Sequence, residues 1–279
     1  MLIDTHCHLV SPRYAGVSPE ELASRAAARG VGHCVSLGTE RADWEAQLEL
    51  ARGLPQFVTP CLAVHPTEAH LAEDGDMGLL RQLASDSPVG AIGEAGLDYY
   101  WPAPEGWTEE AYRSRQGELL EAHFEIARDL GLNISLHTRD RTGAASFEDA
   151  VTIARRYPSV RPVFHCFIGS QEQAARVFDE LDGYISLTGI VTFKNAPAVH
   201  DVASWCPLDR LMLETDAPYL APEPVRGSVN EPSCVRFIAE RVALLRGVPV
   251  EAVEEATTET ARRFFRMADE AIRKTGEPA

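Results

Sequence analysis

Lysine is scarce in this 279-residue sequence, and long apolar runs and paired cysteines are absent. Lysine occurs only at Lys194 and Lys274, so nearly all basic charge is arginine. The six cysteines contain no CxxC pair, which argues against a zinc ribbon or a disulfide framework and favours buried thiols. No apolar run approaches the roughly 18 residues of a membrane span. We also expect no signal peptide, because its cleavage would remove the histidine-bearing segment that begins at residue 2. We therefore expect a cytoplasmic protein that does not contact the membrane and has no obligate protein partner.

Positive charge is scarce in the whole chain. The sequence has 26 Lys and Arg against 42 Asp and Glu, for a net charge of −16 at pH 7. Non-specific affinity for duplex DNA comes mainly from neutralising phosphates, so this balance argues against a protein that coats a duplex. Any chemistry on nucleic acid must take place at a local site, with metal ions supplying the positive charge.

Short apolar, β-branched runs alternate along the chain with stretches of helical periodicity, a pattern typical of parallel βαβ units. Eight such units in about 250 residues favour a (β/α)8 TIM barrel over a doubly wound sheet. No linker interrupts them, so we predict a single domain over 1–279. Two further helices are expected in the tail, one from about Pro232 and one around Ala252–Lys274. The predicted strands are Leu2–His8, Val31–Leu37, Phe57–Val64, Val89–Leu97, Leu132–His137, Arg161–Phe167, Tyr184–Thr188 and Leu211–Thr215.

Two histidines one residue apart end the first predicted strand, in the segment LIDTHCHLV. Side chains alternate between the two faces of a strand, so His6 and His8 point to the same side. Two converging imidazoles suit a metal ion, although a hydrogen-bonded pair at a strand end would give the same pattern. The choice therefore depends on the other strands.

Further ionisable residues fall towards the carboxyl ends of other predicted strands. Glu94 lies late in the fourth strand, His137 ends the fifth, His165 lies near the end of the sixth and Asp216 closes the eighth. In a TIM barrel these ends meet at one mouth, where the active site lies. Structural histidines would be scattered and would not all lie at this end, so the sequence predicts a metal site there.

Four histidines and two carboxylates exceed what one tetrahedral ion needs and suffice for two divalent ions. Glu94 is the expected bridge, because the fourth strand lies between the first strand and the fifth and sixth. One ion would bind His6, His8, Glu94 and Asp216, and the second would bind Glu94, His137 and His165. Mixed imidazole and carboxylate ligands do not select among Mg²⁺, Mn²⁺ and Zn²⁺.

Seven ordered segments resemble the TatD family of metal-dependent deoxyribonucleases, within the amidohydrolase-like barrels. They are LIDTHCHL, AVHP, AIGEAGLDYY, LHTRD, HCFIGS, SLTGIVTFKNA and RLMLETDAPYLAP followed by RGSVNEP. The resemblance implies a TIM barrel, a divalent-metal centre and DNA hydrolysis, often as a 3′–5′ exonuclease on single strands. The six candidate ligands occupy matching positions. The chain departs from the family pattern at Val10, Ser228 and Thr260; Ser228 replaces a loop lysine, which weakens the expectation of strong DNA binding.

We predict Asp216 as the general base, since a carboxylate that touches both the metal and its water can accept a proton; the alternative is a pure ligand. Glu94 is predicted to act in catalysis as the bridge. Glu214, two residues before Asp216, is predicted to support the ligands from deeper in the barrel. His65 follows the third strand and is expected to bind substrate or orient a ligand rather than to be structural. The other histidines, at positions 33, 70, 123 and 200, are predicted to be structural or solvated.

Basic and aromatic residues are predicted in loops at the same mouth. Arg139, Lys194 and Arg226 would contact substrate phosphate, or they are ordinary solvated charges; Arg139 could pair with Asp140. Aromatic residues crowd the segment after the fourth strand, where they would stack bases or simply pack the loop. These aromatic residues are Tyr99, Tyr100, Trp101 and Trp107.

The sequence predicts a divalent-metal-dependent hydrolase that cleaves phosphodiester bonds at single-stranded DNA ends. An alternative keeps the site but takes a small ester, lactone or amide, because one barrel supports many chemistries. A third reading is a metal-binding barrel without turnover, which a ligand set with open water positions disfavours.

Overall fold

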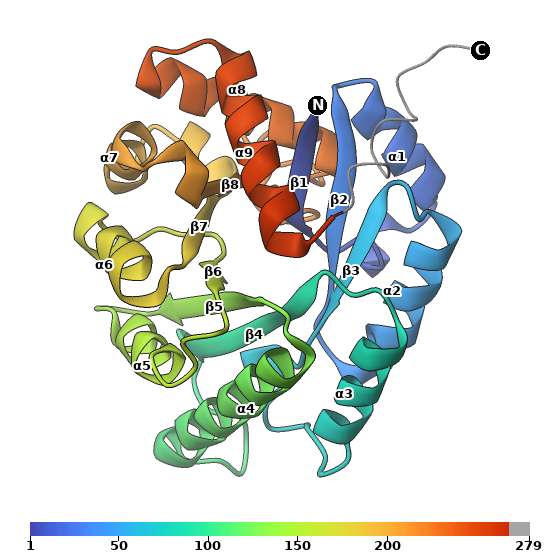
Figure 1. Cartoon of the computed structure of the whole chain (residues 1–279), viewed down its shortest axis with the longest axis vertical. Helices are drawn as coiled ribbons and strands as arrows, with labels where there is room; N and C mark the ends of the chain where they lie inside the picture. Colours follow the sequence, from blue (N-terminus) through green and yellow to red (C-terminus); the bar gives the residue numbers. More distant parts are fainter. Residues whose placement is uncertain (268–279) are drawn as a thin grey trace.

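The computed structural model describes residues 1–267, and eight parallel strands form one sheet whose order follows the chain (Figure 1). The predicted (β/α)8 barrel is confirmed. The segments of the first and last strands share one backbone bridge, between Cys7 and Ala217, so the barrel is nearly closed. The strands are β1 (Leu2–Cys7), β2 (Val31–Gly38), β3 (Val58–Leu62), β4 (Ala91–Tyr99), β5 (Ile134–Asp140), β6 (Pro162–Phe164), β7 (Tyr184–Leu187) and β8 (Leu211–Leu213).

Helices alternate with the strands and surround the barrel (Figure 1). Two helices follow the last strand, as predicted, although the predicted stretch beyond residue 267 lies outside the described residues. The helices are α1 (Pro19–Ala27), α2 (Arg41–Gly53), α3 (Asp76–Asp86), α4 (Glu109–Leu130), α5 (Ala145–Ala154), α6 (Gln171–Leu181), α7 (Pro197–Trp205), α8 (Val235–Arg246) and α9 (Val250–Phe265).

Local sequence signals account for several helix ends. α1 begins with a capping box, in which the Ser18 hydroxyl accepts from the Glu21 N–H and the Glu21 carboxylate accepts from the Ser18 N–H. α4 begins at the cap of Thr108 and ends at Gly131, whose φ of 64° completes a left-handed C-cap. These are the helices that the sequence pattern predicts most clearly.

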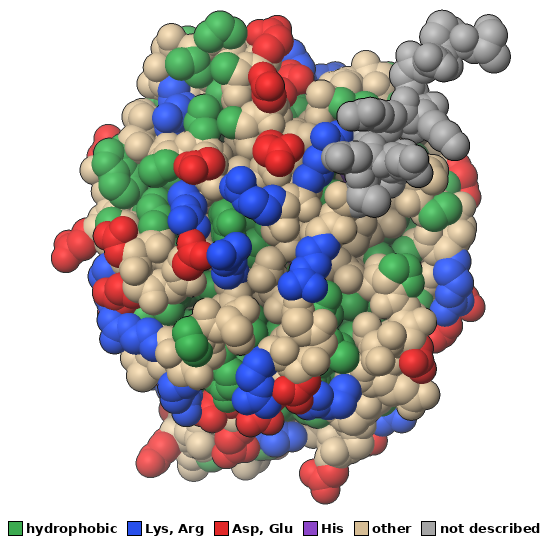
Figure 2. Space-filling model, in the orientation of Figure 1, with side chains coloured by type: hydrophobic (Ala, Val, Ile, Leu, Met, Phe, Trp, Pro, Cys, Tyr) green, Lys and Arg blue, Asp and Glu red, His purple; other side chains and the backbone are tan. Residues whose placement is uncertain are grey.

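The N-terminal end of the barrel is closed by α9. Phe264 and Phe265 of α9 pack into a cluster with Ile3, Val35 and Met212, which belong to strands of the barrel. Figure 2, in the orientation of Figure 1, shows basic and acidic side chains interspersed on this face, and no described histidine is visible there. None of the helices within residues 1–267 is long and apolar enough to cross a membrane.

Hydrogen bonds join the carboxyl ends of β1 and β8. Asp4 is fully buried, and its carboxylate accepts from the backbone N–H of Thr215 at 2.8 Å and from the Thr215 hydroxyl at 2.6 Å. The N–H of Asp216 donates to the His6 carbonyl at 2.9 Å, and the His8 N–H donates to the Ala217 carbonyl at 2.7 Å. These hydrogen bonds form a seam between β1 and β8. The seam therefore fixes the backbone of the segments that carry three candidate ligands.

Candidate metal centre

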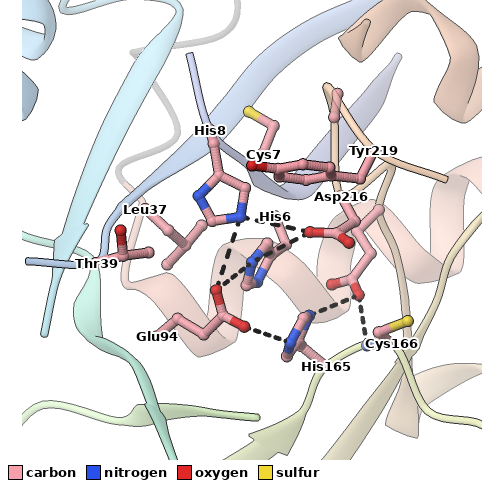
Figure 3. A network of polar contacts seen from close by, with 12 residues as sticks. His6, Cys7, His8, Leu37, Thr39, Glu94, His165, Cys166, Asp216 and Tyr219 are labelled. Carbon is pink, nitrogen blue, oxygen red and sulfur yellow. Dashed lines mark hydrogen bonds and ion pairs between the residues drawn. The ribbon is translucent and has the colours of Figure 1, made fainter. Parts of the chain in front are cut away.

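All six predicted ligands converge at the carboxyl end of the barrel, and Figure 3 shows five of them facing one another. They come from five strands. His6 lies on β1 and His8 directly after it, Glu94 lies on β4 and His137 on β5, and His165 and Asp216 follow the short strands β6 and β8.

The two carboxylate oxygens of Glu94 face different histidines. Oε2 lies 3.3 Å from His6 Nε2 and 3.7 Å from His8 Nε2. Oε1 lies 2.9 Å from His137 Nδ1 and 2.7 Å from His165 Nε2. Glu94 thus stands between two sets of imidazoles, as expected of a carboxylate that bridges two ions.

Asp216 completes the first of these sets. Its Oδ1 lies 3.4 Å from His8 Nε2 and 3.8 Å from His6 Nε2. Asp216 adopts a φ of 56°, and Cys166, next to His165, a φ of 47°. Left-handed backbone in a non-glycine residue is uncommon and gathers at functional sites, and here it turns the chain sharply beside two candidate ligands.

The partners of both carboxylates hold their pKa values low. Burial alone would raise the pKa of Glu94, which is only 4% exposed, but the charge of His165 and the hydrogen bond from His137 hold that pKa well below its usual value. For Asp216, burial is likewise outweighed by the hydrogen bond from His8 and by the charge of His6, so its pKa is lowered. The site therefore offers anionic oxygen ligands.

The chemistry of His6 fits a bound cation. Its side chain is fully buried, and neither ring nitrogen has a hydrogen-bond partner within residues 1–267. Its ring stacks on that of His165, with centroids 4.0 Å apart and planes 10° apart. A buried imidazole without hydrogen bonds is costly unless a ligand satisfies it, and a divalent ion held with Glu94 and Asp216 would do so.

Two further carboxylates orient ligand histidines. Asp98 Oδ2 lies 3.0 Å from His137 Nε2, which leaves Nδ1 facing Glu94. Glu214 Oε1 forms an ion-pair contact with His165 Nδ1 at 3.4 Å, without a hydrogen bond, and Nε2 faces the centre. Carboxylate–histidine pairs of this kind fix the ring and raise its basicity.

Sequence reasoning predicted Glu214 as a support for the ligands but missed Asp98. Asp98 lies four residues after Glu94 on β4, so the two-residue alternation of a strand could have indicated it. Gly96 stands between them with a φ of 150°, and a Cβ there would lie 2.0 Å from the His137 carbonyl oxygen. Glycine thus allows β4 to approach β5 closely at the centre.

His65 reaches the cluster through its Nε2, which lies 3.4 Å from Glu94 Oε1. Its Nδ1 lies 2.6 Å from the Thr67 hydroxyl oxygen and 3.2 Å from the Thr67 backbone nitrogen. Burial lowers the pKa of His65, which favours the neutral ring. Ligand atoms of His65, Glu94 and His137 lie close enough together to hold a metal ion.

Arg139 and Tyr99 do not lie in rim loops, and this part of the prediction is wrong. Both belong to strands, because β4 continues to Tyr99 and β5 to Asp140. The two strands remain paired up to these last residues. Asp140 accepts hydrogen bonds from Ser146 rather than from Arg139. The Tyr99 hydroxyl donates to Asp149, so Tyr99 faces α5.

The other predicted rim residues are exposed around the mouth. Lys194 follows β7 and is exposed. Arg226 follows β8, lies over the ring of Phe193 at 4.2 Å and is 4.0 Å from a Glu223 oxygen. Trp107 packs against Tyr112, which fits loop packing.

The remaining histidines lie outside the cluster. His33 and His123 are buried and hydrogen-bonded, and burial lowers the pKa of each to about 4. His70 binds the Thr67 carbonyl at 3.1 Å, and the buried Nε2 of His200 has no hydrogen-bond partner within residues 1–267.

A TIM barrel with an imidazole–carboxylate cluster at its mouth defines the class of metal-dependent barrel hydrolases. The model of the family described as TatD related DNase matches residues 3–266, and the chain belongs to this family of metal-dependent hydrolases. The resemblance noted in the sequence is thereby confirmed.

Known relatives align with this protein over nearly its whole length. A metal-dependent hydrolase described as uncharacterized, YcfH of Escherichia coli K12, is 38% identical over 270 residues, which cover 95% of this chain and 96% of its own. YabD of Bacillus subtilis 168, described in the same terms, is 36% identical over 269 residues, 96% of this chain and all of its own. The crystal structure of YJJV, a TatD homolog from Escherichia coli K12, superposes with a TM-score of 0.84 at 29% identity, covering 96% of this chain and 98% of that one.

Proposed function

We propose that the protein is a deoxyribonuclease that hydrolyses phosphodiester bonds at single-stranded DNA ends, in the 3′–5′ direction, with two divalent ions bound. The division of the Glu94 oxygens between two sets of histidines is the observation that carries this proposal. Two-ion sites of this kind suit phosphoryl transfer, because they can hold both the attacking and the leaving oxygen.

The ligands follow from the contacts of the cluster. His6, His8, Glu94 and Asp216 would hold one ion; Glu94, His137 and His165 would hold the second. Mg²⁺, Mn²⁺ or Zn²⁺, when bound, would acidify water and polarise the phosphoryl oxygens. Asp98 and Glu214 keep the lone pairs of His137 and His165 directed at the centre.

Proton movements are assigned to Asp216 and His65. Asp216 lies at the open side of the cluster with its pKa lowered, so it is available as the base that accepts the proton of the attacking water. With its proton on Nε2, beside Glu94, His65 would donate a hydrogen bond to a substrate oxygen. Arg139, Lys194 and Arg226 would bind substrate phosphates. The cytoplasmic location and the lack of an obligate protein partner stay predictions.

The test is a digest of linear single strands, circular single strands and blunt duplex by metal-reconstituted protein, with and without chelator. We expect rapid shortening of linear single strands from the 3′ end, little cutting of circles, and loss of activity on chelation that added Mg²⁺, Mn²⁺ or Zn²⁺ reverses. Equal rates on circles and linear strands would contradict end-directed cutting. Turnover confined to a parallel panel of esters, lactones and amides would instead establish the alternative substrate class.

A further inference from the structure

A pair formed by an exposed arginine and a tyrosine lies beside the first set of ligands. The guanidinium carbon of Arg13 lies 4.9 Å from the ring centroid of Tyr219, within cation–π range. The Tyr219 ring is 6.0 Å from the His8 ring, edge to face, and Figure 3 shows it next to His8 and Asp216. Tyr219 is 43% exposed, so part of the residue is accessible to a ligand.

A second pair lies beside the other set of ligands. Arg139 of β5 lies over Tyr100 at 4.1 Å and near Trp101 at 5.8 Å, and Trp101 is 51% exposed. Asp98 joins this pair to the centre, because its Oδ1 accepts the Tyr100 N–H at 2.9 Å while its Oδ2 contacts His137 at 3.0 Å. The first pair lies in the segments after β1 and β8, and the second lies at the carboxyl ends of β4 and β5; these are opposite positions in a ring of eight strands.

Hydrogen bonds fix both pairs in place. Next to Arg13, the hydroxyl of Tyr14 donates to the Asn230 carbonyl at 2.7 Å, and the buried Asn230 side chain donates to the Tyr219 carbonyl at 2.6 Å. On the other side, Arg141 donates to the Tyr100 carbonyl at 3.0 Å. Surfaces held in this way bind a ligand with a small ordering cost.

The arginines of these pairs carry charge that the protein does not neutralise. Neither Arg13 nor Arg139 forms an ion pair with a carboxylate within residues 1–267, although acidic residues outnumber basic ones 42 to 26. Arg29 and Arg113 are likewise stacked without an ion pair in this range, whereas the stacked Arg176 and Arg210 pair with carboxylates. Unpaired guanidinium groups on aromatic rings suit a ligand with both π faces and negative charge, which describes a nucleotide.

The geometry points to two nucleoside subsites: Arg13 with Tyr219 on one side of the metal centre, and Arg139 with Tyr100 and Trp101 on the other. This inference rests on the proposed function and specifies how its substrate binds. A single strand crosses the mouth with the scissile phosphate at the metal ligands and one base stacked on each pair. Productive binding therefore requires a base on both sides of the scissile phosphate.

Binding of labelled single-stranded trinucleotides tests the two subsites. Anisotropy with chelator present reports affinity without turnover, for an intact trinucleotide and for two versions that each lack one of the bases flanking the scissile linkage. Arg13→Ala and Arg139→Ala should each weaken binding of the intact strand about tenfold, the usual scale for losing one stacked base. Arg13→Ala should not weaken binding of the trinucleotide that lacks the base on its own side of the linkage. Arg139→Ala should not weaken binding of the other abasic trinucleotide.

Arg29→Ala is the matched control. Arg29 is also exposed and stacks on an aromatic ring, that of Phe237. It lies in the segment that precedes β2, at the other end of the barrel. Tyr219→Ala and Trp101→Ala should reproduce the arginine effects, and in turnover assays all four variants should raise KM about tenfold with kcat within about twofold. Losses equal to those of Arg29→Ala, or losses that persist on both abasic strands, would overturn the inference. The proposed function fails separately, if the parent binds as expected yet hydrolyses no DNA with any metal.

Discussion

At the scale of a single residue, Asp216 combines two properties. Its carboxylate contacts His8 and His6, and its left-handed backbone is fixed by the hydrogen bond that its N–H donates to the His6 carbonyl. The conformation places the carboxylate at the mouth while its pKa stays low. A ligand that is also a base must satisfy both conditions, so substitution by the isosteric amide separates them.

We predict that Asp216→Asn lowers turnover by about 100-fold or more while part of the bound metal remains, because an amide oxygen can still ligate but cannot accept a proton. Turnover and metal content should be measured on the same preparations. Glu94→Gln is the comparison variant and should lose metal as well as activity, since Glu94 contacts both sets of histidines. A metal-loaded Asp216→Asn protein with parental turnover would show that Asp216 is not the base.

His123 is a residue whose titration affects stability. Burial lowers its pKa to about 4, below the usual 6.5, so between these pH values the unfolded chain binds a proton that the folded chain does not. Stability therefore falls as the pH decreases from 6.5 to 4, with a slope of up to about 1 kcal/mol per pH unit from this group. His123→Gln should flatten the slope by that amount.

Urea unfolding of metal-free protein at several pH values measures this slope. The ligand histidines are present in both proteins, so their contribution cancels in the difference between them. Parallel stability curves for the parent and His123→Gln would show that His123 titrates normally in the fold.

At the scale of elements, the seam between β1 and β8 is the least regular part of the barrel. The two strands share one backbone bridge, and the carboxylate of Asp4 supplies acceptors to Thr215 where further ladder bonds would otherwise be. The Asp4 side chain thus completes the barrel beside the segments that carry His6, His8 and Asp216.

We predict that Asp4→Ala lowers the free energy of unfolding by about 1–3 kcal/mol, because the buried N–H and hydroxyl of Thr215 lose their acceptor. Asp4→Asn should cost less, since its amide oxygen can still accept the Thr215 N–H. Chemical denaturation with chelator present measures stability apart from metal binding. The two variants should also weaken metal affinity in the same order, and equal stability of parent and Asp4→Ala would contradict this account of the seam.

At the scale of the whole molecule, the net charge of −16 opposes the binding of a long polyanion. Arg13 and Arg139, which form no ion pair within residues 1–267, place positive charge beside the metal centre. A short single strand needs only these contacts, whereas a duplex would bring many phosphates against acidic surface.

We predict faster hydrolysis of single-stranded ends than of blunt duplex, with a shallow salt dependence. Each phosphate neutralised on a single strand adds only about 0.7 to the slope of log affinity against log salt, so two or three contacts give a slope of roughly −2. KM measured over a salt series provides the slope, and Lys194→Ala should reduce it. A slope as steep as that of a duplex-binding protein would contradict a substrate held by a few rim contacts.

The sequence alone was sufficient to predict the class of fold, the six candidate ligands and the end of the barrel at which they meet. Two-residue alternation and strand order depend on local backbone geometry, which short segments encode. Strand ends were predicted less well: β6 and β8 stop at Phe164 and Leu213, and β5 carries Arg139 within it. A single domain over 1–279 stays a prediction.

Only the tertiary structure decided which atoms meet. The division of the Glu94 oxygens, the contact of Asp98 with His137 and the pairing of Arg13 with Tyr219 each join residues from different parts of the chain. Arg13 and Tyr219 are 206 positions apart in the printed sequence, and no periodicity relates them. Their distance depends on how β1 and β8 close the barrel, because that closure brings the segments after the two strands side by side.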